Sequence, residues 1–164
     1  RPTSGKVIVN GKVIGKDVDF PESTGIIIET PGFLAHYSGL RNLKLLAGVS
    51  HKADEARARA VMKMVKLNPD NKKTVGQYSL GMRQRLGIAQ AIMEDPQLLI
   101  LDEPFNGLDQ DGIHEIHELF QKLKLQGKTI LLASHSASDI SRACDEVFEI
   151  KDGVLEKIPK KDSK

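Results

Sequence analysis

The sequence of 164 residues predicts an α/β fold in which a helical subdomain is inserted into a core built on a parallel sheet. From residue 96 onward, short apolar segments alternate with amphipathic ones, which is typical of a parallel sheet covered on both faces. Between residues 33 and 95, helical segments follow one another without a strand pattern. We therefore expect residues 1–32 and 96–164 to form the core and residues 33–95 to form the helical subdomain.

The first part of the core is expected to supply a hairpin and one strand. Segments 6–9 and 12–14 are rich in β-branched residues and flank Asn10-Gly11, a dipeptide that favours a tight turn. The apolar run 25–29 is too short for a helix and fits a buried strand.

Three helices are expected in the subdomain. Ser38 can cap the first, the second extends over about 53–67, and the third begins after Ser79. Residues 33–95 hold 11 Lys and Arg against 5 Asp and Glu, while the remaining residues hold 13 against 17. We expect most of these charges to lie on solvated helix faces. Arg83 and Arg85 are of special interest because they follow the start of the third helix.

The second part of the core begins after Pro96 and repeats strand and helix. The expected elements are strands at 98–101 and 129–133, helices at 111–125 and after Ser136, and a closing hairpin within 147–155. The apolar positions of the longer helix recur at helical spacing and are expected to face inward: Ile113, Ile116, Phe120 and Leu123.

Composition excludes several classes of protein. Lys and Arg number 24 against 22 Asp and Glu, so the chain lacks the basic excess of a dedicated nucleic-acid binder. The single cysteine, Cys144, cannot form an internal disulfide and is expected to be a small packed residue. No apolar run approaches the ~20 residues of a membrane span. Because Arg1 leads almost directly into a strand, we expect the chain to be part of a longer protein.

The strongest local signal is a pair of carboxylates directly after the strand at 98–101. Asp102 and Glu103 would lie at the carboxyl end of a parallel strand, where α/β sheets bind ligands. Asp102 suits a Mg²⁺ site, since Mg²⁺ takes few carboxylates and keeps several waters. Glu103 suits the deprotonation of an attacking water. An ordinary strand end followed by a turn is the structural alternative.

Two further signals are weaker when taken alone. Ser79 begins a helix whose first N–H groups are unpaired, and Gly81 allows a ligand to approach closely, so this end can hold an anion. A normal helix cap is the alternative. His135 follows Ser134 at the end of the strand 129–133, beside Asp102 if the two strands are neighbours. Alone, a histidine in such a place is usually structural.

Together, these signals closely resemble the ATP-binding subunit of ABC transporters over essentially the whole chain. The resemblance rests on the order and spacing of SLGMRQR at 79–85, DEPFNGLD at 102–109 and Ser134-His135. It implies a three-layer P-loop NTPase-type core with an inserted helical subdomain, here truncated at its N-terminus. Implied ligands are ATP and Mg²⁺.

The family motifs can be carried over residue by residue. Residues 78–82 resemble the signature motif LSGGQ, whose Ser79 and Gly81 would contact ATP held by the opposite protomer. Asp102 matches the Walker B aspartate, a Mg²⁺ ligand, and Glu103 matches the catalytic glutamate.

Three further residues match positions in other motifs of the family. His135 matches the catalytic switch histidine, which contacts the γ-phosphate, and Asp109 ends the D-loop at the dimer seam. Glu29 lies in the segment that resembles the Q-loop and would meet Mg²⁺ or its water.

Three departures from the family pattern accompany the resemblance. Glu29 replaces the usual glutamine, a feature also found in the bacitracin-resistance and lantibiotic-immunity branch, which we therefore favour. In the signature motif, Leu80 replaces glycine and Met82 replaces glutamine. No G-x-x-x-x-G-K-[ST] motif occurs, so the sequence contains no Walker A phosphate cradle.

The intact protein is accordingly expected to be an ATPase that energises an ABC exporter. Its partners would be a transmembrane permease and a second ATP-binding subunit in a head-to-tail dimer, without nucleic acid, at the cytoplasmic side of the membrane. This chain alone is expected neither to bind nor to hydrolyse ATP usefully. The alternatives are a soluble ABC-type ATPase of translation or DNA repair, and a non-catalytic interaction fragment.

A possible metal pair on the helix 111–125 is assigned a structural role. His114 and His117 are three residues apart, but Glu115 and Glu118 accompany them. Because a metal site would need further converging ligands, we expect both histidines to lie on a solvated helix face.

Overall fold

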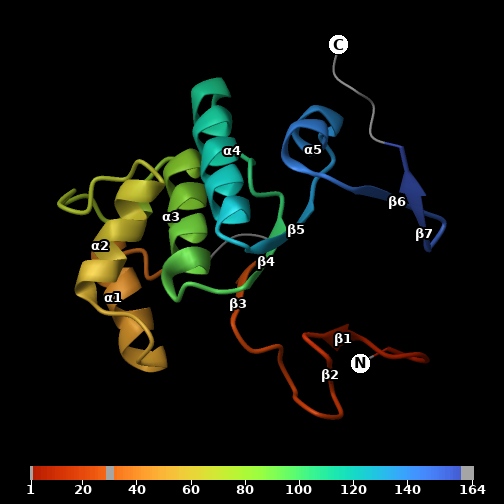
Figure 1. The fold of residues 1–164 in the computed structure, drawn as a ribbon. Coiled ribbons are helices and arrows are strands. Elements are labelled where there is room, and N and C mark those ends of the chain that lie inside the picture. Colours follow the sequence, from red (N-terminus) through yellow and green to blue (C-terminus); the bar gives the residue numbers. More distant parts are fainter. Residues whose placement is uncertain (1, 29–31, 160–164) are drawn as a thin grey trace.

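A three-stranded parallel sheet forms the centre of the computed structural model, which describes residues 2–28 and 32–159 (Figure 1). Its strands are β3 (Thr24–Ile27), β4 (Leu98–Asp102) and β5 (Thr129–Ala133), in the order β3-β4-β5. β4 pairs in parallel with both neighbours, and Asp102 lies opposite Ala133. The predicted α/β class with a parallel sheet is therefore confirmed.

Helices α3 (Leu80–Met93) and α4 (Gln110–Leu125) cover one face of this sheet (Figure 1). Alternation along the strands directs Ile27, Leu99 and Leu101 to that face, where each is at most 3% exposed. The inward positions predicted for α4 join the same apolar core. The core is thus concentrated between the sheet and these two helices.

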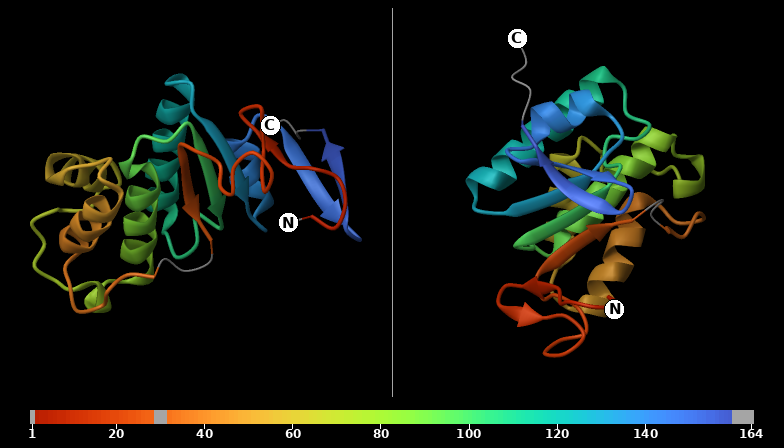
Figure 2. Two further views of the ribbon diagram at one scale, coloured as in Figure 1. Left: turned by 90° about the horizontal axis from the view of Figure 1, so that it is seen from below. Right: turned by 90° about the vertical axis from the view of Figure 1, so that its right-hand side faces the viewer.

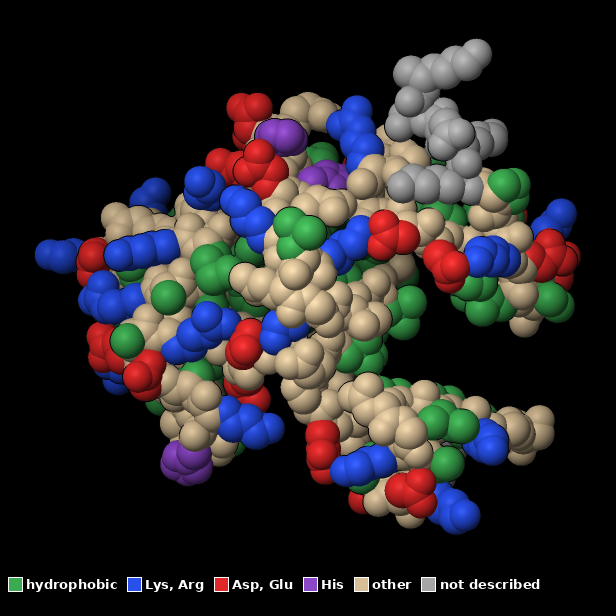
Figure 3. Space-filling model, in the orientation of Figure 1, with side chains coloured by type: hydrophobic (Ala, Val, Ile, Leu, Met, Phe, Trp, Pro, Cys, Tyr) green, Lys and Arg blue, Asp and Glu red, His purple; other side chains and the backbone are tan. Residues whose placement is uncertain are grey.

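The opposite face of the sheet is open in the described part of the chain. Ile26, Ile28 and Leu131 point to this face and are 39%, 66% and 61% exposed. A groove of about 1110 Å³ separates it from the closing hairpin, and Figure 3 shows apolar side chains along the recess. The expected burial on both faces is therefore wrong for the described residues: α5 (Ala137–Ala143) packs against α4 rather than across this face.

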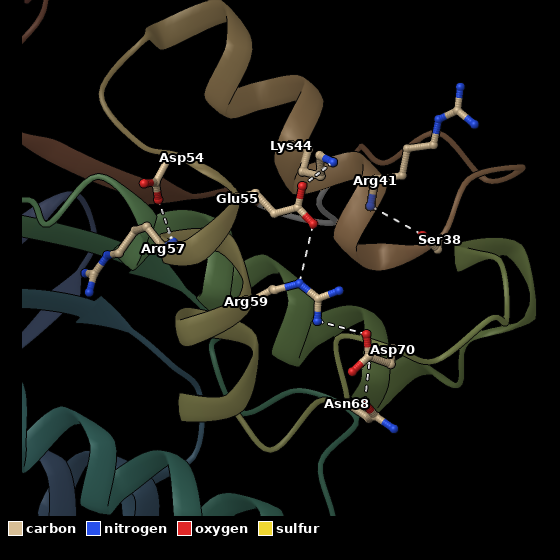
Figure 4. Close-up of polar contacts among 9 residues, drawn as sticks. All are labelled: Ser38, Arg41, Lys44, Asp54, Glu55, Arg57, Arg59, Asn68 and Asp70. Atoms are coloured by element: carbon tan, nitrogen blue, oxygen red, sulfur yellow. Dashed lines mark hydrogen bonds and ion pairs between the residues drawn. The ribbon is translucent and has the colours of Figure 1, made fainter.

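The helical part contains α1 (Gly39–Ser50), α2 (Glu55–Met64) and the 3₁₀ turn η1 (Val75–Gln77). As predicted, Ser38 caps α1, because its side chain accepts a hydrogen bond from the Arg41 N–H. Asp54 caps α2 in the same manner (Figure 4). α3, which is predicted as part of the helical subdomain, packs on α2 and also on the sheet. It therefore connects the helical part with the core.

Charged side chains hold α1 and α2 together at the surface (Figure 4). The Glu55 carboxylate pairs with Lys44 of α1 and with Arg59 of its own helix. Arg59 also pairs with Asp70, at 2.8 Å between Nη1 and Oδ1. These pairs are largely exposed, as expected for charges on solvated helix faces.

Both predicted hairpins are present. β1 (Ile8–Val9) pairs with β2 (Lys12–Val13), and β6 (Val147–Lys151) pairs with β7 (Val154–Ile158), each antiparallel. The hairpins lie at the opposite end of the molecule from α1 and α2 (Figures 1 and 2). Within residues 2–28 and 32–159, no helix combines the length and apolarity needed to cross a membrane.

Candidate functional site

The polar residues predicted at the ends of β4 and β5 meet at one edge of the sheet. Because the two strands are parallel and in register, Asp102 and Ala133 end side by side. The Glu103 N–H continues the ladder by donating to the Ala133 carbonyl at 2.9 Å. Ser134 and His135 follow directly, so their side chains lie beside Glu103.

The Glu103 carboxylate is held by three donors from the neighbouring strand end. Its Oε1 accepts from the His135 backbone N–H at 2.9 Å and lies 2.8 Å from His135 Nδ1. Its Oε2 accepts from the Ser134 hydroxyl at 3.2 Å. Burial raises the pKa of Glu103, but these hydrogen bonds outweigh burial and lower the pKa below its ordinary value. Glu103 is therefore ionised at neutral pH and able to accept a proton.

The His135 ring extends into solvent, with 88% of its side chain exposed. Because an ionised carboxylate can only accept hydrogen bonds, Nδ1 carries the proton in the contact with Glu103. The other ring nitrogen, Nε2, is left to face an approaching ligand. The pairing of Glu103 with His135 joins the two residues predicted to be catalytic.

Asp102 is half-buried, and its carboxylate forms no hydrogen bond or ion pair with the described residues. An unpaired carboxylate at a ligand-binding sheet edge fits a Mg²⁺ ion that takes one protein ligand and keeps its waters. The described residues contain no group of three or more His, Cys, Asp or Glu placed to hold a metal ion. Glu29, the other predicted Mg²⁺ ligand, lies outside the described residues.

Ser79 and Gly81 lie at the start of α3, where Gly81 packs closely against the segment that follows Glu103. The Ser79 hydroxyl accepts from the Met82 N–H at 3.2 Å, which confirms the predicted cap. A Cβ added to Gly81 would lie 2.7 Å from the Gly107 carbonyl oxygen, so close packing requires glycine here. Among the described residues, no hydrogen bond joins Ser79 or Gly81 to the group around Glu103.

Asp109 forms the other helix cap of the region. Its Oδ1 accepts from the Gly112 N–H at 2.9 Å and so begins α4. The predicted D-loop residue therefore has a local structural role, and its exposed position leaves it accessible to a neighbouring molecule.

The two arginines of α3 bind protein groups. The Arg83 guanidinium donates twice to the Tyr78 carbonyl oxygen. Arg85 donates to the Val65 carbonyl at 2.9 Å and pairs with Glu115 of α4 at 2.7 Å. Arg85 thus connects α3 with both α2 and α4.

His117 corrects the prediction made for the histidine pair on α4. The His114 side chain is 77% exposed, as expected, but His117 is only 9% exposed, and neither of its ring nitrogens has a hydrogen-bond partner among the described residues. Its ring stacks on Phe105 with centroids 4.5 Å apart. The reason is helical periodicity, since His117 shares the buried face with Phe120.

The buried His117 should make folding stability depend on pH. Burial lowers its pKa from about 6.5, Asp139 opposes this effect, and Arg142 and His114 add to it. Between the ordinary and the lowered pKa, the unfolded chain binds more protons, so stability should decrease as pH falls below about 6.5. Denaturant midpoints near neutral pH and below the ordinary pKa would measure this decrease.

His117→Phe should retain the stack on Phe105 and reduce the decrease, whereas His114→Gln on the exposed face should not. An unchanged pH dependence in His117→Phe would contradict the assignment.

Comparison with known proteins defines the class of protein. The family model described as "ABC transporter" matches residues 1–106. An uncharacterized ABC transporter ATP-binding protein of Bacillus subtilis strain 168 is 40% identical over 99% of this chain and 76% of its own length. The chain therefore belongs to the ABC transporter family of ATP-binding proteins.

Other relatives agree with the branch predicted from the sequence. A bacitracin transport ATP-binding protein of Enterococcus faecalis is 41% identical over 94% of this chain, and a lantibiotic transport ATP-binding protein of Streptococcus pyogenes is 38% identical over the same share. The chain spans 51% and 67% of these two relatives, and about half the length of several others.

Solved structures confirm the fold. The ATP-binding cassette MJ0796, in a dimeric post-hydrolysis state bound to ADP and Pi, superposes with a TM-score of 0.80 over 96% of this chain and 75% of its own. Its sequence identity is 21%. The likeness establishes the ATP-binding cassette fold.

Proposed function

We propose that this chain is the part of an ABC ATPase that carries the signature and Walker B motifs, and that the ATPase energises export through a membrane permease. The observation that carries this proposal is the Glu103 carboxylate, which is held by His135 and Ser134. It lies beside Asp102, which has no hydrogen-bond or ion-pair partner among the described residues. We use the term complete ATPase unit for this chain together with a Walker A segment, which its 164 residues do not contain.

Each residue of the site has a chemical task in this proposal. Glu103 orients a water molecule and accepts its proton as the water attacks. Asp102 holds Mg²⁺, which neutralises charge on the phosphate oxygens when bound. His135, through the exposed Nε2, contacts the γ-phosphate that departs. The hydrogen bond from His135 Nδ1 to Glu103 is retained and fixes the orientation of the imidazole ring.

The signature residues are proposed to act on a second copy. Ser79 and Gly81 lie at the start of α3, a helix end that favours an anion, and within the described residues no hydrogen bond joins them to the Glu103 group of their own chain. We infer a head-to-tail dimer in which α3 of each subunit, here called the signature helix, contacts ATP held by the other subunit. Asp109 lies near the interface between the two subunits in this arrangement. The dimeric state of the solved cassette supports this arrangement.

Calorimetric titration with Mg-ATP tests the division of labour. The 164-residue chain should give no saturable binding up to about 1 mM, because P-loop ATPases draw their phosphate contacts from a backbone cradle and a lysine that this sequence lacks. The complete ATPase unit should bind Mg-ATP and hydrolyse it. Micromolar, saturable binding by the monomeric 164-residue chain would contradict the proposal.

The permease is proposed to dock beside α1, at the cytoplasmic side of the membrane. Leu34 is 48% exposed there, and its backbone is fixed by two hydrogen bonds with the buried Asn42 side chain. Arg41 lies over the Tyr37 ring, 4.0 Å from its centroid. Apolar and aromatic groups on a supported loop suit the docking of a helix.

Cross-linking tests the docking site. A cysteine at Ala35, which is exposed between Leu34 and the Tyr37 ring, should cross-link to the permease in membranes that contain the complete unit. A cysteine at Lys151, in the closing hairpin at the other end of the molecule, is the matched control and should not. Equal cross-linking at both positions, or none at Ala35, would contradict the site.

A further inference from the structure

Gln84 is a polar side chain in the most buried part of α3. Only 6% of it is exposed, and the helix positions after it include the fully buried Leu86 and Ile88. A buried amide requires hydrogen-bond partners. Its Nε2 donates to the main-chain carbonyl of Glu103, with 3.1 Å between nitrogen and oxygen.

The carbonyl that Gln84 binds belongs to a strained residue. Glu103 has a φ of +46°, in the left-handed region that residues with side chains rarely adopt. Such a conformation persists when the surrounding structure holds it in place. The same carbonyl oxygen also accepts from the Asn106 N–H at 3.1 Å, so the turn after β4 is closed by one local bond and one bond from α3.

Three different segments therefore fix Glu103. β5 binds its N–H through Ala133, the residues after β5 bind its carboxylate, and α3 binds its carbonyl through Gln84. Of these contacts, only the last comes from α3, the helix that begins with the signature residues. Among the described residues, the Gln84 side chain is thus the direct hydrogen-bond connection between α3 and the candidate general base, Glu103.

Further contacts join α3 to the segment after Glu103. The Leu80 side chain packs on Gly107, where an added Cβ would lie 2.4 Å from Leu80 Cγ. Directly after Gln84, Arg85 pairs with Glu115 of α4. A displacement of the signature helix would therefore reach the Glu103 turn through contacts on both sides of Gln84.

We propose that Gln84 is a positioning residue that couples the signature helix to the carboxylate of Glu103. By holding the carbonyl in the left-handed turn, Gln84 directs the side chain toward His135 and the attacking water. This inference rests on the proposed function, in which Glu103 is the general base.

Kinetics of the complete ATPase unit provide the first test. Gln84→Met retains the approximate volume but removes the donor, and it should lower kcat about 10–10²-fold because the base is misplaced. The KM for Mg-ATP should stay within about twofold, since the nucleotide contacts are unchanged. Gln90→Met, at a partly exposed position of the same helix, is the matched control and should leave both constants unchanged. Equal kcat in Gln84→Met and wild type would overturn the inference.

Gln84→Glu provides a rescue with its own pH signature. Burial raises the pKa of a carboxyl group at this position, and the protonated form can donate to the Glu103 carbonyl. Activity relative to wild type should therefore approach one at low pH and fall as pH rises. A purely space-filling role would give the same relative activity at all pH values, which would overturn the inference. This variant also serves if Gln84→Met fails to fold.

A structural readout separates this inference from the proposed function. In the 164-residue chain, amide hydrogen exchange followed by NMR should become faster at the Glu103 and Asn106 N–H groups in Gln84→Met but not in Gln90→Met. Both N–H groups belong to the turn that the Gln84 hydrogen bond holds, and loss of that bond loosens the turn. If Glu103→Gln hydrolyses ATP normally, the proposed function fails, whereas unchanged exchange at both amides in Gln84→Met shows that the coupling itself is wrong.

Discussion

Glu103→Gln should reduce steady-state hydrolysis of Mg-ATP by the complete ATPase unit about 10²–10⁴-fold while leaving nucleotide binding in place. Glutamine has nearly the same shape: its oxygen can still accept from the His135 backbone N–H, and its NH2 group can donate to the Ser134 hydroxyl oxygen. It cannot accept a proton from water at neutral pH. The loss should therefore fall on kcat and not on the affinity for Mg-ATP.

Single-turnover hydrolysis and equilibrium binding of Mg-ATP, measured on the same preparation, separate the two effects. Glu118→Gln is the matched control, because Glu118 is exposed on α4 and, among the described residues, its carboxylate pairs with His114 alone. It should hydrolyse ATP at the wild-type rate. A near wild-type single-turnover rate in Glu103→Gln would show that a different group activates the water.

The meeting of Glu103 and His135 was predicted on the condition that the two strands before them are neighbours. Two apolar runs of strand length each ended in polar residues, and parallel neighbours bring such ends together. The structure confirms this arrangement through the register of β4 and β5. Helix starts at Ser38, Ser79 and Ser136 were predictable for an equally local reason, since each cap depends on one side chain.

Contacts between distant segments were not predictable. Nothing in the local sequence indicates that Glu103 adopts a positive φ. The Glu103 carbonyl is bound by Gln84, which lies nineteen residues earlier in the chain, so the contact cannot be read from neighbouring residues. His117 could have been assigned to the buried face from its spacing to Phe120. Its polar neighbours concealed that periodicity, and its stacking partner, Phe105, precedes the helix.

The open face of the sheet shows where strand composition misleads. Continuous apolar runs predicted strands buried on both faces, yet Ile28 and Leu131 are largely exposed in the described structure. The residue type indicates that a side chain favours burial, whereas its burial in the fold depends on which other segments pack against that face of the sheet. Glu29 could not be assessed in this way, since it lies outside the described residues.

Gly25→Ala should destabilise the fold by about 3 kcal/mol or more, through overpacking where α3 crosses β3. A Cβ added to Gly25 would lie 2.0 Å from the Ala91 carbonyl oxygen and 2.8 Å from Leu99 Cδ2. The first neighbour is helix backbone, so α3 as a whole would have to shift, and with it the hydrogen bond from Gln84 to Glu103. Urea denaturation measures the loss of stability.

Gly48→Ala is the matched control: no atom lies within 4 Å of its added Cβ, and a helical alanine should be neutral or stabilise by about 0.5–1 kcal/mol. Equal midpoints for Gly25→Ala and wild type would show that α3 does not press against β3 at this position.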